Sequence, residues 1–509
     1  MSASDRPANA TDAANMAGVA SAGSAAASSQ RAIAGLLEPR PHALVDPDSG
    51  WHRTLRGMHE TSALLFAASL PLATAPKDVL AAFALVLWLL RLPVTWRDLL
   101  LARRSLIVWS LAACVIVHAV SVRWSLNPSE GIEELRSLRY LGLPLIFWPV
   151  LRAPGALALG LMFGVVGLVA LQVMQDREYF DWTPAYGGRL GGLLHPPIAG
   201  LFCATGLLLA LAVARDGSFW PRGPGEGAGE GSGERSGHGW SAGRSWQCTW
   251  LAALLVPIAG YGLVASGGRA AWIATMVGVA VLVVQGAWRW SRPAGGERRG
   301  RRVAALAVMV VVAAVAGWTM GGDLIRARVQ QVAADLERAE TGDFDSDNGF
   351  RVVAARTAGR MFLERPWRGW GAGSFRPYAE TTEHAEVLRR GWHPHSVPLH
   401  VASEQGVLGL LPLLTLVFAA GWAGLRSRHV HAAAGGALAA GLAFAAAAQF
   451  DAWHVAGQTV ALAMVLLMLV LRSPRDARSG VATDPSGDSA SPASPASPAA
   501  PVASIGART

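Results

Sequence analysis

Long apolar blocks fill most of the chain between its two polar ends. Each block runs for about 20 residues without the alternation of half-buried strands, and that length is what a helix needs to cross a bilayer. About twelve such spans are expected, near residues 58–75, 77–93, 105–122, 138–152, 155–174, 198–214, 248–266, 270–287, 303–321, 407–425, 432–450 and 454–471. The pattern therefore predicts an all-α polytopic membrane protein.

Arginine placement predicts how these spans are oriented. Arginine-rich loops follow the second, eighth, tenth and last spans, with the sequences "RLPVTWRDLLLARR", "RWSRPAGGERRGRR", "RSRHVH" and "RSPRDAR". Short cytoplasmic loops collect arginine, whereas "NPSEGIEELRSLR" after the third span carries acidic residues and is expected on the opposite side. Both ends of the chain are then cytoplasmic.

The polar segments divide the chain into parts. Residues 1–56 and 472–509 have the composition of disordered tails, without a signal peptide, and 215–247 resembles a flexible cytoplasmic loop. Spans one to nine occupy 57–321 and spans ten to twelve occupy 407–471. Between them, 322–406 is too long for a structureless loop, and its apolar spacing predicts a small helical cap on the outer face.

Composition changes this picture only slightly. The chain is 52% hydrophobic and 16% charged, and only one of its 44 basic residues, Lys77, is a lysine. The net charge of +9 reflects arginine-rich loops, so no nucleic-acid partner is expected. Cys114, Cys203 and Cys248 form no CxxC pair and predict neither a disulfide framework nor a metal site.

The stretch "HPHSVPLHVASEQGVLGLL", residues 393–411, places histidines at the edge of the tenth span. Ser396 is expected to cap a short helix that Gly406 ends, and Glu404 is interpreted as a structural polar residue within it. The helix dipole disfavours protonation of His395, which suits a general base; a histidine that only hydrogen-bonds a loop is the alternative. The HxH pair has no third ligand at a motif spacing, so no metal is expected.

Two arginines in outer segments are candidates for binding an anion. Arg269 in "ASGGRAAWIA" opens the eighth span after two glycines, and Arg189 in "YGGRLGGLLHPPIAG" is also flanked by glycines. Either arginine alone is more typical of snorkelling to the membrane surface. Together with His395 on the same face, they favour a site for a lipid-linked phosphate.

Weaker candidates lie nearby. Arg351 is expected either to contact substrate or to form a salt bridge with the acidic loop "DFDSDNG", residues 343–349, which suits a helix cap or a cation site. Tyr186 and Trp182, close to Arg189 in sequence, are candidates for stacking on a sugar.

The histidine motif resembles that of a known family. His395 and Ser396, followed by Gly406 and Gly409, are similar to the H-[NSQ]-x9-G-x2-G signature of the O-antigen ligase and polymerase superfamily. The upstream "RPWRGWGAGSF" resembles a second family element, and "ASGGRAAW" resembles a third, with Gly268 where the family has serine. The resemblance covers roughly residues 58–471.

The resemblance implies a GT-C-like fold in the inner membrane of a Gram-negative bacterium, with the active site facing the periplasm. O-antigen on undecaprenyl diphosphate would be transferred to a lipid A-core sugar with inversion and without a metal or other cofactor. His395 would act as base while Arg189 and Arg269 bind the diphosphate. The ligase branch fits the spacing and the arginine elements best; a polymerase or a protein O-oligosaccharyltransferase shares the donor, and a flippase is the alternative from another class.

Overall fold

The computed structural model describes residues 50–103, 105–147, 154–179, 189–216, 241–290, 322–391 apart from 324, 325, 328 and 390, 393–427, 432–450 and 457–471, with 392 excluded. The chain divides into two compact units, Met1–Thr54 and Leu55–Thr509, and every contact discussed below lies within the second. Residues 1–49 of the tail predicted at 1–56, the tail predicted at 472–509, the ninth span at 303–321, most of the loop 215–247, Tyr186 and Trp182 lie outside the described residues. Residues 50–56 are helical, so the predicted N-terminal tail extends too far along the chain.

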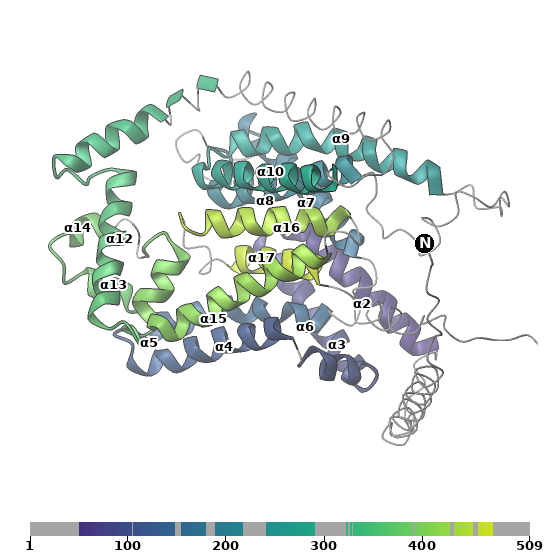
Figure 1. Ribbon diagram of the computed structural model, residues 1–509, viewed down its shortest axis with the longest axis horizontal. Coiled ribbons are helices and arrows are strands. Elements are labelled where there is room, and N and C mark those ends of the chain that lie inside the picture. The colour runs from purple at the N-terminus through teal and green to yellow at the C-terminus, as the bar shows by residue number, and fades with distance from the viewer. Residues whose placement is uncertain are drawn as a thin grey trace, which may run out of the picture. The chain divides into compact units, whose positions relative to one another are not determined.

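Every labelled element is a helix (Figure 1). The first half contains α2 (Gly50–Ser69), α3 (Thr74–Ala102), α4 (Leu106–Ser121), η1 (Val122–Trp124), α5 (Pro128–Ser137), η2 (Leu138–Gly142), α6 (Leu143–Phe147), α7 (Pro154–Asp176) and α8 (Pro196–Asp216). The second half contains α9 (Ser241–Ala265), α10 (Arg269–Trp290), α12 (Asp347–Glu364), α13 (Phe375–Ala379), α14 (Ala385–Leu388), α15 (Val397–Ser427), α16 (Ala432–Ala447) and α17 (Gly457–Val470).

Six of the described helices are long and apolar enough to cross a membrane. They cover Thr74–Trp96, Leu106–Trp124, Gly155–Asp176, Pro196–Arg215, Arg269–Trp288 and Val397–Ser427, and shorter apolar helices cover Trp250–Ala265, Ala433–Ala447 and Gly457–Val470. The all-α polytopic membrane fold is therefore confirmed. The count of twelve spans stays a prediction.

Two predicted span boundaries are displaced in the structure. The first span was expected to run to residue 75, but α2 ends at Ser69, because Pro71 has no backbone N–H to continue the helix. The fourth was expected from residue 138, where the structure has the 3-10 helix η2 followed by the five-residue helix α6. Apolar composition alone does not reveal either break.

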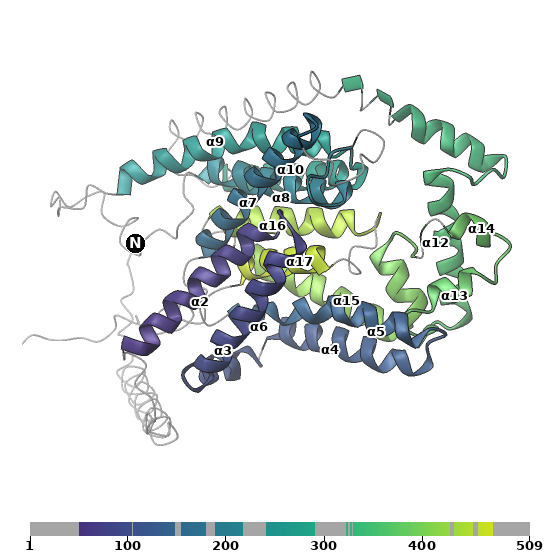
Figure 2. The same ribbon diagram turned by 180° about the vertical axis from the view of Figure 1, so that it is seen from behind.

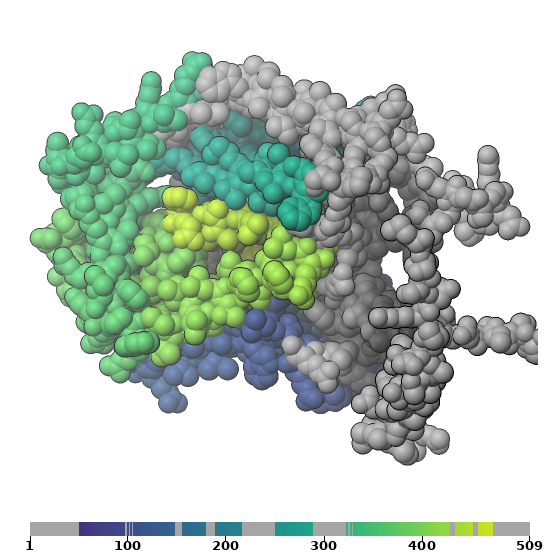
Figure 3. Space-filling view, in the orientation of Figure 1, coloured from purple at the N-terminus to yellow at the C-terminus, as the bar shows by residue number. Residues whose placement is uncertain are grey.

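Helices α16 and α17 lie at the centre of the second unit. One side of α16 packs against α8 and α10, while α15 and α17 pack against its other sides, and α4 pairs with α15 (Figures 1 and 2). In Figure 3, α16 reaches the visible face between α10 and α15. Helix α16 therefore lies between the pair α8 and α10 on one side and α15 on the other.

The cap has a small apolar core of its own. Phe350, Val353, Met361, Phe375 and Leu388 are buried together, from α12, α13 and α14. Residues 329–340 are also helical, in agreement with the helical content expected between 322 and 406. Since α12 packs against α15, the cap core lies directly beside the start of the helix that follows His395.

Candidate active site

The turn before α15 holds His395 in an unusual backbone conformation. His395 has φ +49°, and only one other described non-glycine residue, Glu178, has a positive φ. Such a conformation costs about 1–3 kcal/mol, so the surrounding contacts must impose it. The backbone N–H of Val397 donates to the carbonyl of Ala448 (2.8 Å), and the N–H of His400 donates to that of Ser396 (2.9 Å). The predicted capping position of Ser396 is confirmed, with its Oγ 3.5 Å from the N–H of Leu399.

Helix α15 consists of two parts that meet at Gly406. Gly406 has φ +63° and ψ −156°, which interrupts the helix where the sequence predicted an end. A Cβ at Gly406 would lie 2.5 Å from the backbone of Trp367, so only glycine fits this approach. The N–H groups of Val407 and Leu408 donate to the carbonyls of Pro366 and Trp367 (2.8 and 3.1 Å). Two sequence motifs about 40 residues apart are thus joined at one point.

The first turn of α12 contacts both His395 and Arg269. The ring of Phe350 meets the imidazole of His395 edge-on, with centroids 5.2 Å apart and an interplanar angle of 86°. The Nη1 of Arg269 donates to Oδ1 of Asn348 (3.0 Å), and the Nδ2 of Asn348 donates in turn to Oδ2 of Asp335 (2.8 Å). These contacts hold the guanidinium at the N-terminal end of α12.

Arg189 reaches the same turn from the segment before α8. Its Nη2 lies 3.9 Å from Oδ2 of Asp347, and its side chain is 25% exposed. The aliphatic part lies against Gly267, where a Cβ would be 2.9 Å from Cγ of Arg189. The neighbouring Leu190 donates its N–H to the carbonyl of Ala265 (2.9 Å), which ties this segment to the end of α9.

Arg351, on the next turn of α12, donates from Nη1 to the carbonyl of Phe450 (3.2 Å). The salt bridge expected with the acidic loop is absent among the described residues, because the loop carboxylate of Asp343 pairs with Arg338 instead (2.7 Å). Ser346 in that loop caps α12 by accepting from the N–H of Gly349 (3.0 Å), as the helix-cap interpretation predicted. Arg189, Arg269, Arg351 and His395 therefore all lie around one turn, residues 347–351.

A second polar cluster, largely buried, lies beside the first part of α15. The Nε2 of His400 is 3.1 Å from Oε2 of Glu404 and 3.2 Å from Oε1 of Glu134 on α5. The side chains of His400 and Glu404 are 2% and 1% exposed. We call these three residues the buried cluster.

Glu404 also holds the glycine-rich loop that precedes α13. Its Oε2 accepts the N–H of Gly373 and its Oε1 accepts the N–H of Phe375, both at 2.9 Å, while its backbone carbonyl accepts the N–H of Gly371 (2.7 Å). Glu404 therefore has the structural role that was expected of it. The carboxylate ties the glycine-rich loop to the helix that begins beside His395.

His118 extends this network into α4. Its Nδ1 is 3.0 Å from Nε2 of Gln405 and its Nε2 is 3.1 Å from the carbonyl of Gly131. The amide donates to Nδ1 and the ring donates to the carbonyl, which is the pattern of a neutral imidazole. His118, His400 and Glu134 were not among the residues predicted from the sequence. The available signals were a histidine within an apolar span, as at His118, and the i, i+4 spacing of His400 and Glu404.

Burial raises the pKa of Glu134 to about 7, and the nearby carboxylate of Glu404 contributes to this rise. Donor atoms of Glu134, His400 and Glu404 all lie within 4.8 Å of one another, close enough to hold a metal ion. The separations of 3.1 and 3.2 Å also permit ion pairs between the imidazole and the two carboxyl groups.

Comparison with known proteins adds a match to one family model. Residues 250–414 match the model of the Wzy_C family, described as O-Antigen ligase, and this range contains Arg269, Arg351 and His395 but not Arg189. The resemblance seen in the sequence is confirmed over these residues. Members of this family are glycosyltransferase-like enzymes that act on lipid-linked glycans. No curated protein matches the chain.

Proposed function

We propose that the protein transfers O-antigen polysaccharide from undecaprenyl diphosphate to a sugar hydroxyl of lipid A-core, because residues 250–414 match the model of the Wzy_C family, described as O-Antigen ligase. The observation that carries this proposal is the convergence of three arginines and His395 around residues 347–351. A base beside several guanidinium groups suits a reaction in which a hydroxyl is deprotonated while a diphosphate leaves.

The proposed roles follow from the chemistry of each group. His395 takes the proton of the acceptor hydroxyl as its oxygen bonds to the anomeric carbon of the glycan. The bond from that carbon to the diphosphate breaks on the opposite face, so the configuration inverts and undecaprenyl diphosphate leaves. Arg189 and Arg269 offset the charge that develops on the leaving diphosphate. Arg351 borders the site through α12, and Ser396 fixes the turn that carries His395.

The proposal places this site on the periplasmic side of the inner membrane of a Gram-negative bacterium. The arginine-rich loops after the second, eighth, tenth and last spans support that orientation, because they put the cap on the side opposite the cytoplasm. Both substrates are lipids, and the reaction needs no cofactor in this scheme, since the arginines provide the positive charge.

The test is the lipopolysaccharide ladder of a strain that lacks this gene, complemented with wild type or with His395→Ala at matched membrane levels. Wild type should restore O-antigen-capped lipopolysaccharide, whereas the variant should leave the glycan on its lipid carrier. A deletion strain that still caps with single repeat units but lacks long chains would instead identify a polymerase. Unchanged ladders together with loss of donor translocation would identify a flippase.

A further inference from the structure

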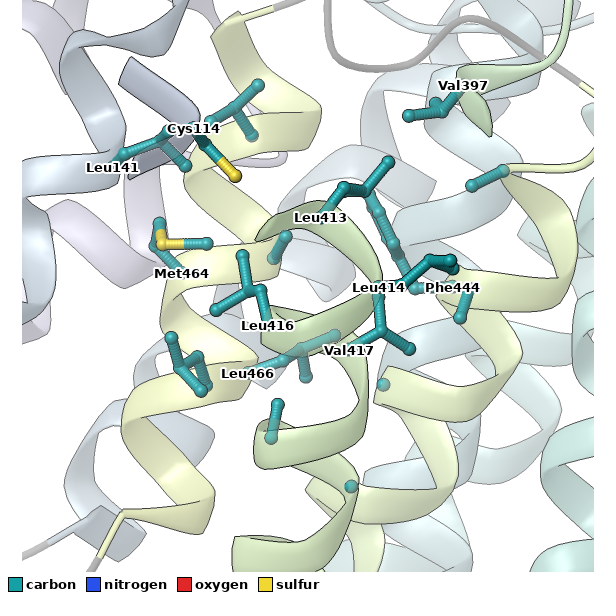
Figure 4. Close-up of a pocket in the computed structure, with 18 of the residues that line it drawn as sticks. Cys114, Leu141, Val397, Leu413, Leu414, Leu416, Val417, Phe444, Met464 and Leu466 are labelled. Carbon is teal, nitrogen blue, oxygen red and sulfur yellow. The ribbon is translucent and has the colours of Figure 1, made fainter. Parts of the chain in front are cut away.

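An apolar cavity of about 300 Å³ lies among the membrane helices beside the candidate active site. Its walls come from α4, η2, α15, α16 and α17, and include Cys114, Leu141, Leu413, Phe444, Met464 and Leu466 (Figure 4). The proposed function assigns no role to this cavity.

The cavity begins beside the turn that carries His395 and extends along the helices from there. Val397 and Pro398, the second and third residues after His395, line it, as does Ala448, whose carbonyl accepts the N–H of Val397. On α16 the lining runs from Ala437 to Ala445, which is about 12 Å of helix and more than a third of a hydrocarbon core. An apolar chain inside the cavity could therefore belong to a molecule whose polar end lies at His395.

Two glycines show that the cavity is open space. A Cβ built at Gly421 on α15 or at Gly441 on α16 would meet no atom within 4 Å, and both residues line the cavity. Apolar cavities of this size exclude water and bind apolar molecules. Because two of the walls, α4 and α15, are long and apolar enough to cross a membrane, hydrocarbon chains are available to this cavity.

The packing of α16 distinguishes the two lipid substrates. Helix α16 packs on one side against α8 and α10, the helices beside Arg189 and Arg269, and on another against α15, which lines the cavity. A polyprenyl diphosphate held by the arginines would begin on the α10 side of α16. The cavity begins on the α15 side, so it is suited to the other lipid.

Building on the proposed function, we propose that this cavity binds a fatty acyl chain of the acceptor lipid and thereby positions the acceptor sugar at His395. The cavity makes recognition of the acceptor depend on its lipid part as well as on its sugar. A polymerase would use a polyprenyl-linked acceptor instead, so a straight acyl chain in the cavity would also favour the ligase.

The kinetic test uses substitutions that fill the cavity. Gly441→Leu and Gly421→Leu place a side chain in the open space, and Gly260→Leu on α9 is the matched control, since Gly260 also has no atom within 4 Å and does not line the cavity. Purified full-length protein in nanodiscs would be assayed with intact lipid A-core and with the same core oligosaccharide after removal of its acyl chains. Thermal unfolding of each variant verifies the fold.

For both filling variants, KM for intact lipid A-core should rise at least about tenfold, because each excluded methylene is worth roughly fourfold in affinity. KM for the deacylated acceptor and for the donor should stay at the values of the control variant. A rise in KM for the donor alone would assign the cavity to the polyprenyl chain and overturn the proposal. Unchanged KM values for both lipids would overturn it as well.

A binding test separates this proposal from the proposed function. Cys114 would be kept as the only cysteine, with Cys203→Ala and Cys248→Ala, and its reaction with an N-alkyl maleimide would be followed with lipid A-core or undecaprenyl phosphate added. Protection by lipid A-core alone supports acyl binding even if no transfer is detected, in which case only the proposed function fails. Transfer without any protection, or protection by undecaprenyl phosphate alone, overturns the acyl-chain proposal and leaves the transferase intact.

Discussion

Two polar clusters flank the first part of α15, and they differ in how their charges are satisfied. In the buried cluster, His400 and Glu404 are almost completely shielded, and each contacts other polar groups within 3.2 Å. Around residues 347–351, Arg189 is a quarter exposed, and its contact with Asp347 is a long 3.9 Å.

The difference indicates different roles for the two clusters. Charges removed from water are tolerated only when they are fully paired, so the buried cluster is suited to joining α5, the glycine-rich loop and α15. Partly exposed guanidinium groups are accessible to a ligand that approaches from the surface. The buried cluster therefore positions the residues around 347–351. Variants in the buried cluster should lose stability, and variants around 347–351 should lose activity.

The largest predicted contrast is between His395→Ala and His400→Ala. The first variant removes the proposed base and should lower kcat by about 10²–10⁴ while leaving the melting temperature near that of wild type. The second leaves Glu134 and Glu404 buried without their shared partner and should lower stability by about 3–5 kcal/mol. Transfer rates and thermal unfolding of the purified proteins measure both. Equal loss of stability in the two variants would show that His395 and His400 do not differ in their structural role.

Arg269→Gln should reduce kcat/KM by roughly 10–100-fold, the value of one charged hydrogen bond to the diphosphate. Arg269→Lys keeps the positive charge but loses the planar guanidinium, so its activity should lie between those of wild type and Arg269→Gln. Stability should change little, because Asn348 retains Asp335 as a partner. Wild-type kinetics in the glutamine variant would assign Arg269 to the same structural class as the buried cluster.

Glu134 should make stability depend on pH in a specific direction. Its pKa is raised from 4.5 to about 7 by burial, so the folded state binds more protons than the unfolded state between these values. This contribution destabilises the fold as pH rises from about 4.5 to about 7, and changes little outside that window. The stability difference between wild type and Glu134→Gln should fall across it, as followed by thermal unfolding. Parallel curves would show that Glu134 titrates normally.

Ser396→Ala is expected to have the smallest effect. Its Oγ is 3.5 Å from the N–H of Leu399, a long capping contact, so about 1 kcal/mol or less of stability should be lost. Activity should fall only slightly if the backbone bond from Val397 to Ala448 keeps the turn in place. A loss as large as that of His395→Ala would indicate that the hydroxyl contacts a substrate.

Sequence patterns predicted the helical membrane fold and selected the candidate residues around 347–351. They did not predict the contacts of the buried cluster. Apolar blocks of span length and a glycine after a helix are local features, and Gly406 and Ser396 lie where they were expected. Glu134 and His400 are 266 positions apart, and nothing local in either segment indicates that these two side chains meet. Span ends such as Ser69 were misplaced because hydropathy does not account for the missing N–H of proline.

The central claim is that a glycan leaves its lipid diphosphate at His395 and is joined to an acceptor. The most direct measurement uses purified protein with undecaprenyl-diphosphate-linked O-antigen and lipid A-core, and follows both products by mass spectrometry. Wild type should release undecaprenyl diphosphate in step with an acceptor that gains the glycan, and His395→Ala should yield neither product. Wild-type protein that leaves the glycan on its carrier, or a His395→Ala variant that transfers at the normal rate, would contradict the account.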